Sequence, residues 1–240
     1  MLKNILKLNS IAVTEIKFNL SNDKINISVV DPAHVEMIIT EIDKSLFWEY
    51  EIKTESPEQI ISLFFDVDKL LNVLKTSKKE DNFILNYNSE INKNSFDIIT
   101  GSFKQTLSLI DSSTVQESKM PILDLNASFD VLTVDLKEFL NRAENISDYF
   151  SIETSTDKVL LNASGDIDKI DFNPTVQNII SNSIHNSKFS IDYFLNAVKE
   201  LKNLFESLTV EISNDYPVRI TGAKDKLKIV VLIAPRIEAE

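Results

Sequence analysis

Alternating apolar and polar residues dominate much of the chain and predict antiparallel β-strands. Val13, Ile16, Phe18 and Leu20 begin this pattern. A period of two buries one face of a strand and leaves the other face polar. In the first half, strands are expected at about 13–20, 25–29, 35–42, 46–54, 58–66, 82–88, 95–101 and 103–110.

Two stretches in this half change to the spacing of a helix. Residues 1–10 place apolar side chains on one side and lysines on another, which predicts a short amphipathic helix. Residues 65–75 carry Val67, Leu70 and Leu74 at intervals of three or four, with Asp66 or Asp68 in place to cap the helix start. The first half is therefore expected to mix short helices with antiparallel strands.

The second half repeats the first. The hairpin-like stretch 21–31, with its polar turn before an apolar run, recurs at 155–166. Residues 136–140 echo 2–6, and 189–199 echo 65–75, in the same order. This repetition predicts an α+β protein of two similar domains, each with antiparallel sheets and two short helices.

The domain boundaries follow from a break in the pattern. Residues 111–123 are polar first and then form a small apolar cluster, which predicts an extended connector between domains 1–110 and 124–240. In the second copy a strand at 128–132 precedes the helix, whereas the first copy begins at the helix itself. The first domain is therefore expected to lack one strand, either because the start of the gene is truncated or because this domain is smaller and has an open sheet edge.

Composition narrows the function. Thirty-seven acidic and 25 basic residues give a net charge of −12, which repels nucleic acid at long range, so any DNA contact must be local or enforced by topology. The absence of cysteine excludes disulfides, thiolate metal sites and cysteine nucleophiles. Neither a bilayer-spanning run nor a signal peptide is evident, so a soluble cytoplasmic protein is expected.

Catalytic motifs are weak. The carboxylate groups at 66–68 and 166–171 are typical of turns and helix caps, and the second lacks the glycine and glutamate of a calcium-binding loop. His34 and His185 lie far apart in the sequence, without a serine elbow or zinc spacing. We expect no catalytic site, no metal and no cofactor, although an unrelated acidic two-domain, metal-dependent enzyme stays open as an alternative.

Several segments together resemble the sliding clamp of DNA replication, the proliferating cell nuclear antigen family, and most of all its archaeal members. These segments, which run over almost the whole chain, are Val30–Val35, Met120–Leu125, Ala163–Asp166, Asn214–Pro217 and Ile233–Glu238. The resemblance implies three protomers in a ring around double-stranded DNA, with sheets outside and helices inside. A clamp-like subunit that functions only in a heterotrimer is the alternative within this family.

The resemblance also implies three sets of site residues. Residues expected to face DNA are Lys3, Lys7, Lys75, Lys78, Lys79, Lys137, Arg142, Lys199 and Lys202. Those expected to form the partner pocket are Val30, His34, Val35, Met37, Met120, Pro121, Ile122, Leu123, Pro217, Leu232, Ile233, Ala234, Pro235 and Arg236. Those expected at the subunit interface are Gly101, Phe103, Leu107, Ile167, Ile170 and Phe172.

Any single residue in these sets could instead have an ordinary structural role. An exposed helical lysine is usually only a solvated side chain, and Val30, Val35 and Leu232 could be ordinary core residues. Asn72, Glu138, Asn141 and Glu200 stand where the family usually has basic residues. The implied partners are DNA polymerase, the clamp loader, flap endonuclease and DNA ligase, docking through a short motif called the PIP box.

Overall fold

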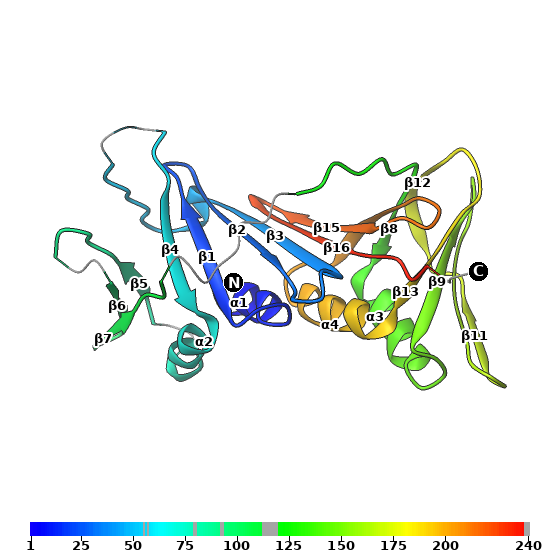
Figure 1. The fold of residues 1–240 in the computed structure, drawn as a ribbon, viewed down its shortest axis with the longest axis horizontal. Coiled ribbons are helices and arrows are strands. Elements are labelled where there is room, and N and C mark those ends of the chain that lie inside the picture. The colour runs from blue at the N-terminus through cyan, green and yellow to red at the C-terminus, as the bar shows by residue number, and fades with distance from the viewer. Residues whose placement is uncertain (55, 57, 79–80, 92–93, 112–119, 238–240) are drawn as a thin grey trace.

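The computed structural model describes residues 1–54, 56, 58–78, 81–91, 94–111 and 120–237. These residues form an elongated α+β molecule in which the helices gather on one side and the sheets lie over them (Figure 1). The predicted fold class is confirmed. Lys79 lies outside the described residues. Within them, no helix is long and apolar enough to cross a membrane.

The helices are short. They are α1 (Leu2–Asn9), α2 (Val67–Thr76), α3 (Thr133–Ala143) and α4 (Ile191–Leu201), with one 3-10 turn, η1 (Lys44–Leu46). As predicted, the Asp66 side chain caps α2 by accepting a hydrogen bond from the backbone N–H of Lys69, at 2.9 Å.

Sixteen strands are assigned in the described residues. Those before the connector are β1 (Glu15–Leu20), β2 (Lys24–Val30), β3 (Glu36–Asp43), β4 (Ile61–Asp66), β5 (Phe83–Asn86), β6 (Ser95–Thr100) and β7 (Phe103–Ser108). Those after it are β8 (Ala127–Leu132), β9 (Tyr149–Thr154), β10 (Val159–Ser164), β11 (Lys169–Phe172), β12 (Val176–Ser181), β13 (His185–Ser190), β14 (Ser207–Ile212), β15 (Val218–Lys224) and β16 (Leu227–Ile233).

The sheets show the repetition. Strand order β3-β2-β1-β4 before the connector matches β11-β10-β9-β13 after it, and the hairpin series β5-β6-β7 matches β14-β15-β16. The last strand of the second unit, β16, pairs antiparallel with β3 of the first unit over seven residues. This pairing joins the units into one nine-stranded sheet of order β12-β8-β14-β15-β16-β3-β2-β1-β4.

The core lies between the sheets and the helices. Alternation sends Ile16 and Phe18 of β1 inward, where Phe18 meets Phe65 edge to face at a ring-centroid distance of 4.9 Å. At the equivalent place in the second unit, Phe189 and Phe194 pack on Phe150. Phe65 and Phe189 each come just before a helix, so the repeated sequence builds repeated aromatic packing.

The strand predicted at 46–54 is wrong. The chain leaves β3 at Asp43, makes the turn η1 and then runs without regular structure over 47–54. Phe47 and Tyr50, three residues apart, bring their rings within 5.5 Å, and the Tyr50 hydroxyl donates to the backbone oxygen of Ser21 at 2.7 Å. In this irregular segment, residues three apart can bring their rings together, whereas a strand would place them on opposite faces.

The first unit differs from the second at one sheet edge. In the second unit β8 precedes α3 and pairs with β14 over six residues. In the first unit no described strand comes before α1, and β5 pairs on one side with β6. Among the described residues the other edge of β5 has no partner strand, so this edge of the sheet is open.

Candidate functional site

The four helices lie side by side on one face of the molecule, in the order α2, α1, α4, α3 (Figure 1). Each helix has an apolar side that packs against the sheets, so its polar side faces away from them. The predicted basic residues at 75, 78, 142, 199 and 202 are exposed, and those at 3, 7 and 137 are half-buried. The described members of the predicted DNA-facing set therefore lie on or at the ends of these helices.

Two of the helical cations are paired. Arg142 forms an ion pair with Glu138 one turn earlier, at 2.6 Å, and Lys69 lies 3.7 Å from the capping Asp66. Within the described part of the chain, Lys3 and Lys7 form no ion pair. The α1 lysines thus keep their charge available to a ligand on this face.

A small apolar cluster forms on the opposite, outer face of the central sheet. Met37, Val230 and Leu232 are its buried centre, and Val30, Ile39 and Leu123 pack around them. Met37 and Leu232 are paired across β3 and β16, so one face of the junction between the units carries the cluster. Four residues of the predicted partner pocket, at 30, 37, 123 and 232, meet here.

The connector end supplies exposed apolar groups beside this cluster. Leu123 packs against the cluster, while Ile122 is 99% exposed and Met120 is 45% exposed. Pro121, between them, is also exposed. Large apolar side chains exposed next to a buried apolar centre are typical of a docking surface.

Two predicted pocket residues point elsewhere. Ile233 is fully buried in the main core, and Val35 packs against the same core. Ile233 faces the helices because neighbouring strand residues alternate between faces, so Leu232 points outward and Ile233 inward. Val35 lies in the bend before β3, outside this alternation. Pro217 precedes Val218, which pairs with Ile233, so it lies near the start of the tail.

The turn and the tail at the edge of this surface are fixed in place. Asp31 accepts hydrogen bonds from the backbone N–H groups of Ala33, Val35 and Glu36, which holds exposed His34 at a φ of 57°. The backbone N–H of Ala234 donates to the oxygen of Val35 at 2.8 Å. This contact ties the tail, which continues through Pro235, to the turn of the first unit.

Beyond that point the tail crosses to the second unit. The N–H of Arg236 donates to the backbone oxygen of Lys188 at 2.7 Å. Its guanidinium carbon lies 4.8 Å from the ring centroid of Tyr149. The tail therefore runs along the outer surface with fixed geometry.

A buried carboxyl that the sequence pattern did not predict lies beneath this turn. Glu36 is 3% exposed, and its Oε1 has no hydrogen-bond partner. Burial, and secondarily the charge of Asp31, raise the pKa of Glu36 to about 8. Tyr193 of α4 donates to Asp31 at 3.2 Å, and burial followed by the Asp31 charge raises its pKa too. The sequence did contain a signal for this burial: Glu36 is separated by an even number of residues from Ile38 and Ile42, so all three point to the buried face of β3.

The predicted subunit-interface residues fall on two separate sheet edges. Gly101, at a φ of 55°, begins the turn before β7, where Phe103 is 70% exposed and Leu107 is half-buried. Ile170 and Phe172 lie on β11, and Ile167 lies in the preceding turn. Within the described residues β7 pairs only with β6, and β11 only with β10. Each edge leaves backbone hydrogen-bonding groups open to another strand.

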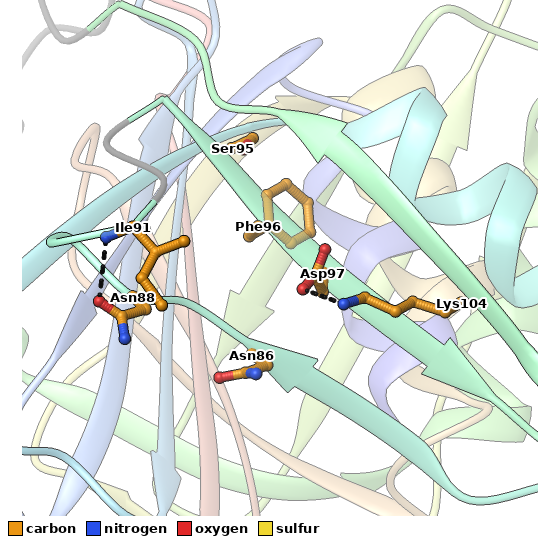
Figure 2. Close-up of a pocket in the computed structure, with 7 residues that line it drawn as sticks. All are labelled: Asn86, Asn88, Ile91, Ser95, Phe96, Asp97 and Lys104. Carbon is orange, nitrogen blue, oxygen red and sulfur yellow. Dashed lines mark hydrogen bonds and ion pairs between the residues drawn. The ribbon is translucent and has the colours of Figure 1, made fainter.

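A separate hollow of about 270 Å³ lies on the sheet β5-β6-β7, lined by Asn86, Asn88, Ile91, Ser95, Phe96, Asp97 and Lys104 (Figure 2). Its carboxylate, Asp97, forms an ion pair with Lys104 at 2.9 Å and accepts a hydrogen bond from the hydroxyl of Thr106. These contacts lower the pKa of Asp97, the Thr106 hydrogen bond most. Among the described residues, no three histidines or carboxylates gather as metal ligands.

No protein-family model matches the chain. It is 31% identical to a DNA polymerase sliding clamp of Methanocella arvoryzae over 99% of this chain and 96% of that protein. The chain belongs to the DNA polymerase sliding clamp family. A second family member, from Methanosarcina barkeri, is 30% identical over 100% of the chain and 96% of its own length. The resemblance found in the sequence is confirmed.

Solved structures of the family agree with the fold. The PCNA in a structure described as the C-terminal region of FEN-1 bound to A. fulgidus PCNA superposes with a TM-score of 0.88. That chain is 26% identical, and the match covers 100% of the present chain and 96% of that one. PCNA from Thermococcus kodakaraensis gives a TM-score of 0.86 at 20% identity, covering 98% and 96%. The clamp fold is thus shown along the whole chain.

Proposed function

We propose that this chain assembles head to tail with two further copies into a closed ring around double-stranded DNA, and that the ring tethers DNA polymerase and other replication enzymes. The observation that carries the proposal is the junction inside the chain. There, β16 at the end of the second unit pairs with β3 of the first. The equivalent strands, β7 and β11, are open edges in the single chain.

The two edges are equivalent to the internal junction residue by residue. Two-residue turns with a φ of 55° at Gly101 and Asp225 close the hairpins before β7 and β16, so Phe103 corresponds to Leu227. In the other unit, the pair Val30 and Met37 corresponds to Ser164 and Lys169. Within the chain, Val231 faces Ile38. Between chains, Leu107 is therefore expected to face Ile170.

This register matches the chemistry of the edges. The expected pairs are Ser108 with Lys169, Leu107 with Ile170, Thr106 with Asp171 and Gln105 with Phe172. Leu107 and Ile170 are both half-buried at the rim of the main core, so their contact continues that core across the interface. Two different edges meet in such a contact, and a contact of this kind builds a ring when the rotation closes.

Partner enzymes are proposed to dock on the outer apolar cluster. Exposed Ile122 and Met120 would close over an apolar anchor that sits on Met37 and Leu232. The solved complex with a FEN-1 C-terminal region shows that a relative binds a peptide of an enzyme. By analogy, PIP-box segments of polymerase, clamp loader, flap endonuclease and DNA ligase would dock here, and the chain itself would act as a tether without catalysis.

The rest of the arrangement fits a tether. We propose that the units 1–110 and 124–240, joined by 111–123, place all four helices toward the DNA, in the cytoplasm where the DNA lies. The predicted cations at 3, 7, 75, 78, 79, 137, 142, 199 and 202 would supply positive charge on the side of the ring that faces the phosphates, without reading sequence. A ring holds DNA by topology, so weak contacts suffice and permit sliding.

Cysteine cross-linking tests the assembly. The chain has no native cysteine, so only the introduced thiols can form disulfides. The pair Ser108→Cys with Lys169→Cys places the thiols opposite each other in the proposed register. Facing residues in antiparallel strands have Cα atoms about 4.5–5.5 Å apart, which a disulfide spans. The control pair, Ser108→Cys with Asp171→Cys, is displaced by two residues to about 7–8 Å.

Oxidation of the first variant should give a covalent trimer on a denaturing gel, and the control should give mostly monomer. Equal cross-linking of both variants, or none in either, would contradict the register. Retention on DNA tests the tether: the covalent trimer should stay on a closed circular duplex after loading and leave once the circle is cut. Loss at the same rate from both forms would refute topological binding.

A further inference from the structure

The helices of the two units differ in charge, although they occupy equivalent places. Within their bounds, α1 and α2 hold four lysines and one aspartate. By contrast, α3 and α4 hold two lysines and one arginine against four carboxylates. The helical face is therefore cationic over the first unit and close to neutral over the second.

Comparison of equivalent positions shows where the difference arises. Lys3 and Lys137 correspond, as do Lys75 and Lys199, so each unit keeps two lysines in place. Four other pairs all make the second unit more negative: Asn4 to Glu138, Lys7 to Asn141, Lys69 to Tyr193 and Thr76 to Glu200. Because the fold is repeated, one unit serves as the reference for the other.

Two changes run in the opposite direction. Asp66, which lies 3.7 Å from Lys69, corresponds to Ser190, so it offsets the Lys69 charge that the second unit lacks. The other change is at Arg142, whose charge is also largely cancelled. Arg142 replaces Leu8, which is buried in the first unit. The guanidinium of Arg142 contacts Glu138 at 2.6 Å, on the same side of α3. Lys7, in contrast, forms no ion pair with the residues that the structure describes. Its charge is free to meet an anion.

We propose that duplex DNA inside the ring is held by α1 and α2 of each protomer, while α3 and α4 form a near-neutral lining that it passes over. This proposal rests on the proposed ring around DNA. Each phosphate that a lysine neutralises releases counterions and adds to affinity. Carboxylates at 138 and 200 repel the same phosphates, so contact with the second unit gains little.

In a closed ring of three protomers, cationic and near-neutral sectors would alternate around the hole. A duplex could then lean against any one cationic sector and transfer to the next while it slides. The contacts would be few, so binding to DNA that is not enclosed should be weak and strongly dependent on salt. This agrees with the acidic charge of the whole chain, −12, which disfavours broad DNA contact.

Reciprocal substitutions at one equivalent pair test the proposal. Lys7→Asn gives α1 the residue of α3, and Asn141→Lys gives α3 the residue of α1; both positions are half-buried. Lys199→Asn removes a lysine from α4, and Lys226→Asn in the turn between β15 and β16 controls for net charge. The measurement is the association constant of the assembled protein for a short fluorescent duplex, over a series of salt concentrations.

Lys7→Asn should weaken binding and reduce the salt slope by about 1 for each phosphate that is no longer neutralised, whereas Lys199→Asn and Lys226→Asn should change it much less. Asn141→Lys should strengthen binding. Equal losses of affinity from Lys7→Asn and Lys199→Asn would overturn the uneven distribution and leave the DNA-encircling function standing. Absence of duplex binding by the unmodified protein, even at low salt, together with no retention on circles, would overturn both.

Discussion

Glu36 is the residue whose ionisation should most affect the stability of the junction between the two units. It lies at the start of β3, opposite Ile233 of β16, and its Oε1 has no hydrogen-bond partner. Burial and neighbouring Asp31 raise its pKa from 4.5 to about 8. Glu36→Gln keeps the shape of the side chain and removes the ionisation.

The sign follows from proton binding. Between pH 4.5 and about 8 the folded protein binds a proton at Glu36 that the unfolded chain has lost. The free energy of unfolding therefore falls as pH rises through this window. Above about pH 8, Glu36 contributes no further pH dependence. At 1.36 kcal/mol per pH unit, the window corresponds to at most about 5 kcal/mol, and to about 3 kcal/mol at neutral pH.

Urea unfolding of both proteins across this pH range gives the measurement. The stability gained by Glu36→Gln should be small near the acid end of the window and should grow toward pH 8. Glu41→Gln provides the control, because Glu41 lies on the same strand and pairs with Lys24 at the surface; its effect should stay below about 1 kcal/mol. Parallel stability profiles for Glu36→Gln and the unmodified protein would refute the reasoning.

Three further predictions concern the interface, the docking surface and the core. Phe103→Ala should shift the assembly toward monomer in sizing with light scattering, without loss of monomer stability, because Phe103 is 70% exposed in the single chain; an unchanged mass would contradict its place in the interface. Ile122→Ala, or Met120→Ala, should weaken a PIP-box peptide by about 1–2 kcal/mol in calorimetry, with the melting temperature unchanged; unaltered affinity would remove these residues from the docking surface. Gly222→Ala should destabilise the fold by about 1–3 kcal/mol, since its Cβ would lie 2.3 Å from the buried ring of Phe205; wild-type urea midpoints would show that the ring can move.

The repeated sequence predicted most of the fold because it repeats the physical causes of the fold. Phe65 and Phe189 fill equivalent places beneath their sheets, and Asp66 caps α2 where the period of the pattern changes. The strand prediction at 46–54 was wrong because Phe47 and Tyr50 pack against each other, and Tyr50 also contacts the β1–β2 turn. Alternation along the sequence does not reveal such tertiary contacts. The spacing of apolar residues predicts secondary structure reliably only where those residues are buried on one face of the element.

The candidate site was less predictable from the sequence. The apolar cluster around Met37 and Leu232 gathers several residues expected to lie together, but Ile233 faces the core because strand register decides which face a residue takes. Val35, in the bend before β3, also packs against the core. Register depends on how distant strands pair, and no local pattern encodes it. The buried Glu36 was missed for a similar reason: its neighbours Asp31 and Tyr193 come from a turn and from a helix far along the chain.

The repeated junction also has a mechanical consequence for a ring built from this chain. Inside the chain the joint has seven paired residues and a covalent tie through the polypeptide. Between chains, β11 offers only four residues to its neighbour, and nothing but side chains and backbone hydrogen bonds would hold them. Force applied to the ring would therefore part it between protomers, with each protomer moving as one rigid arc.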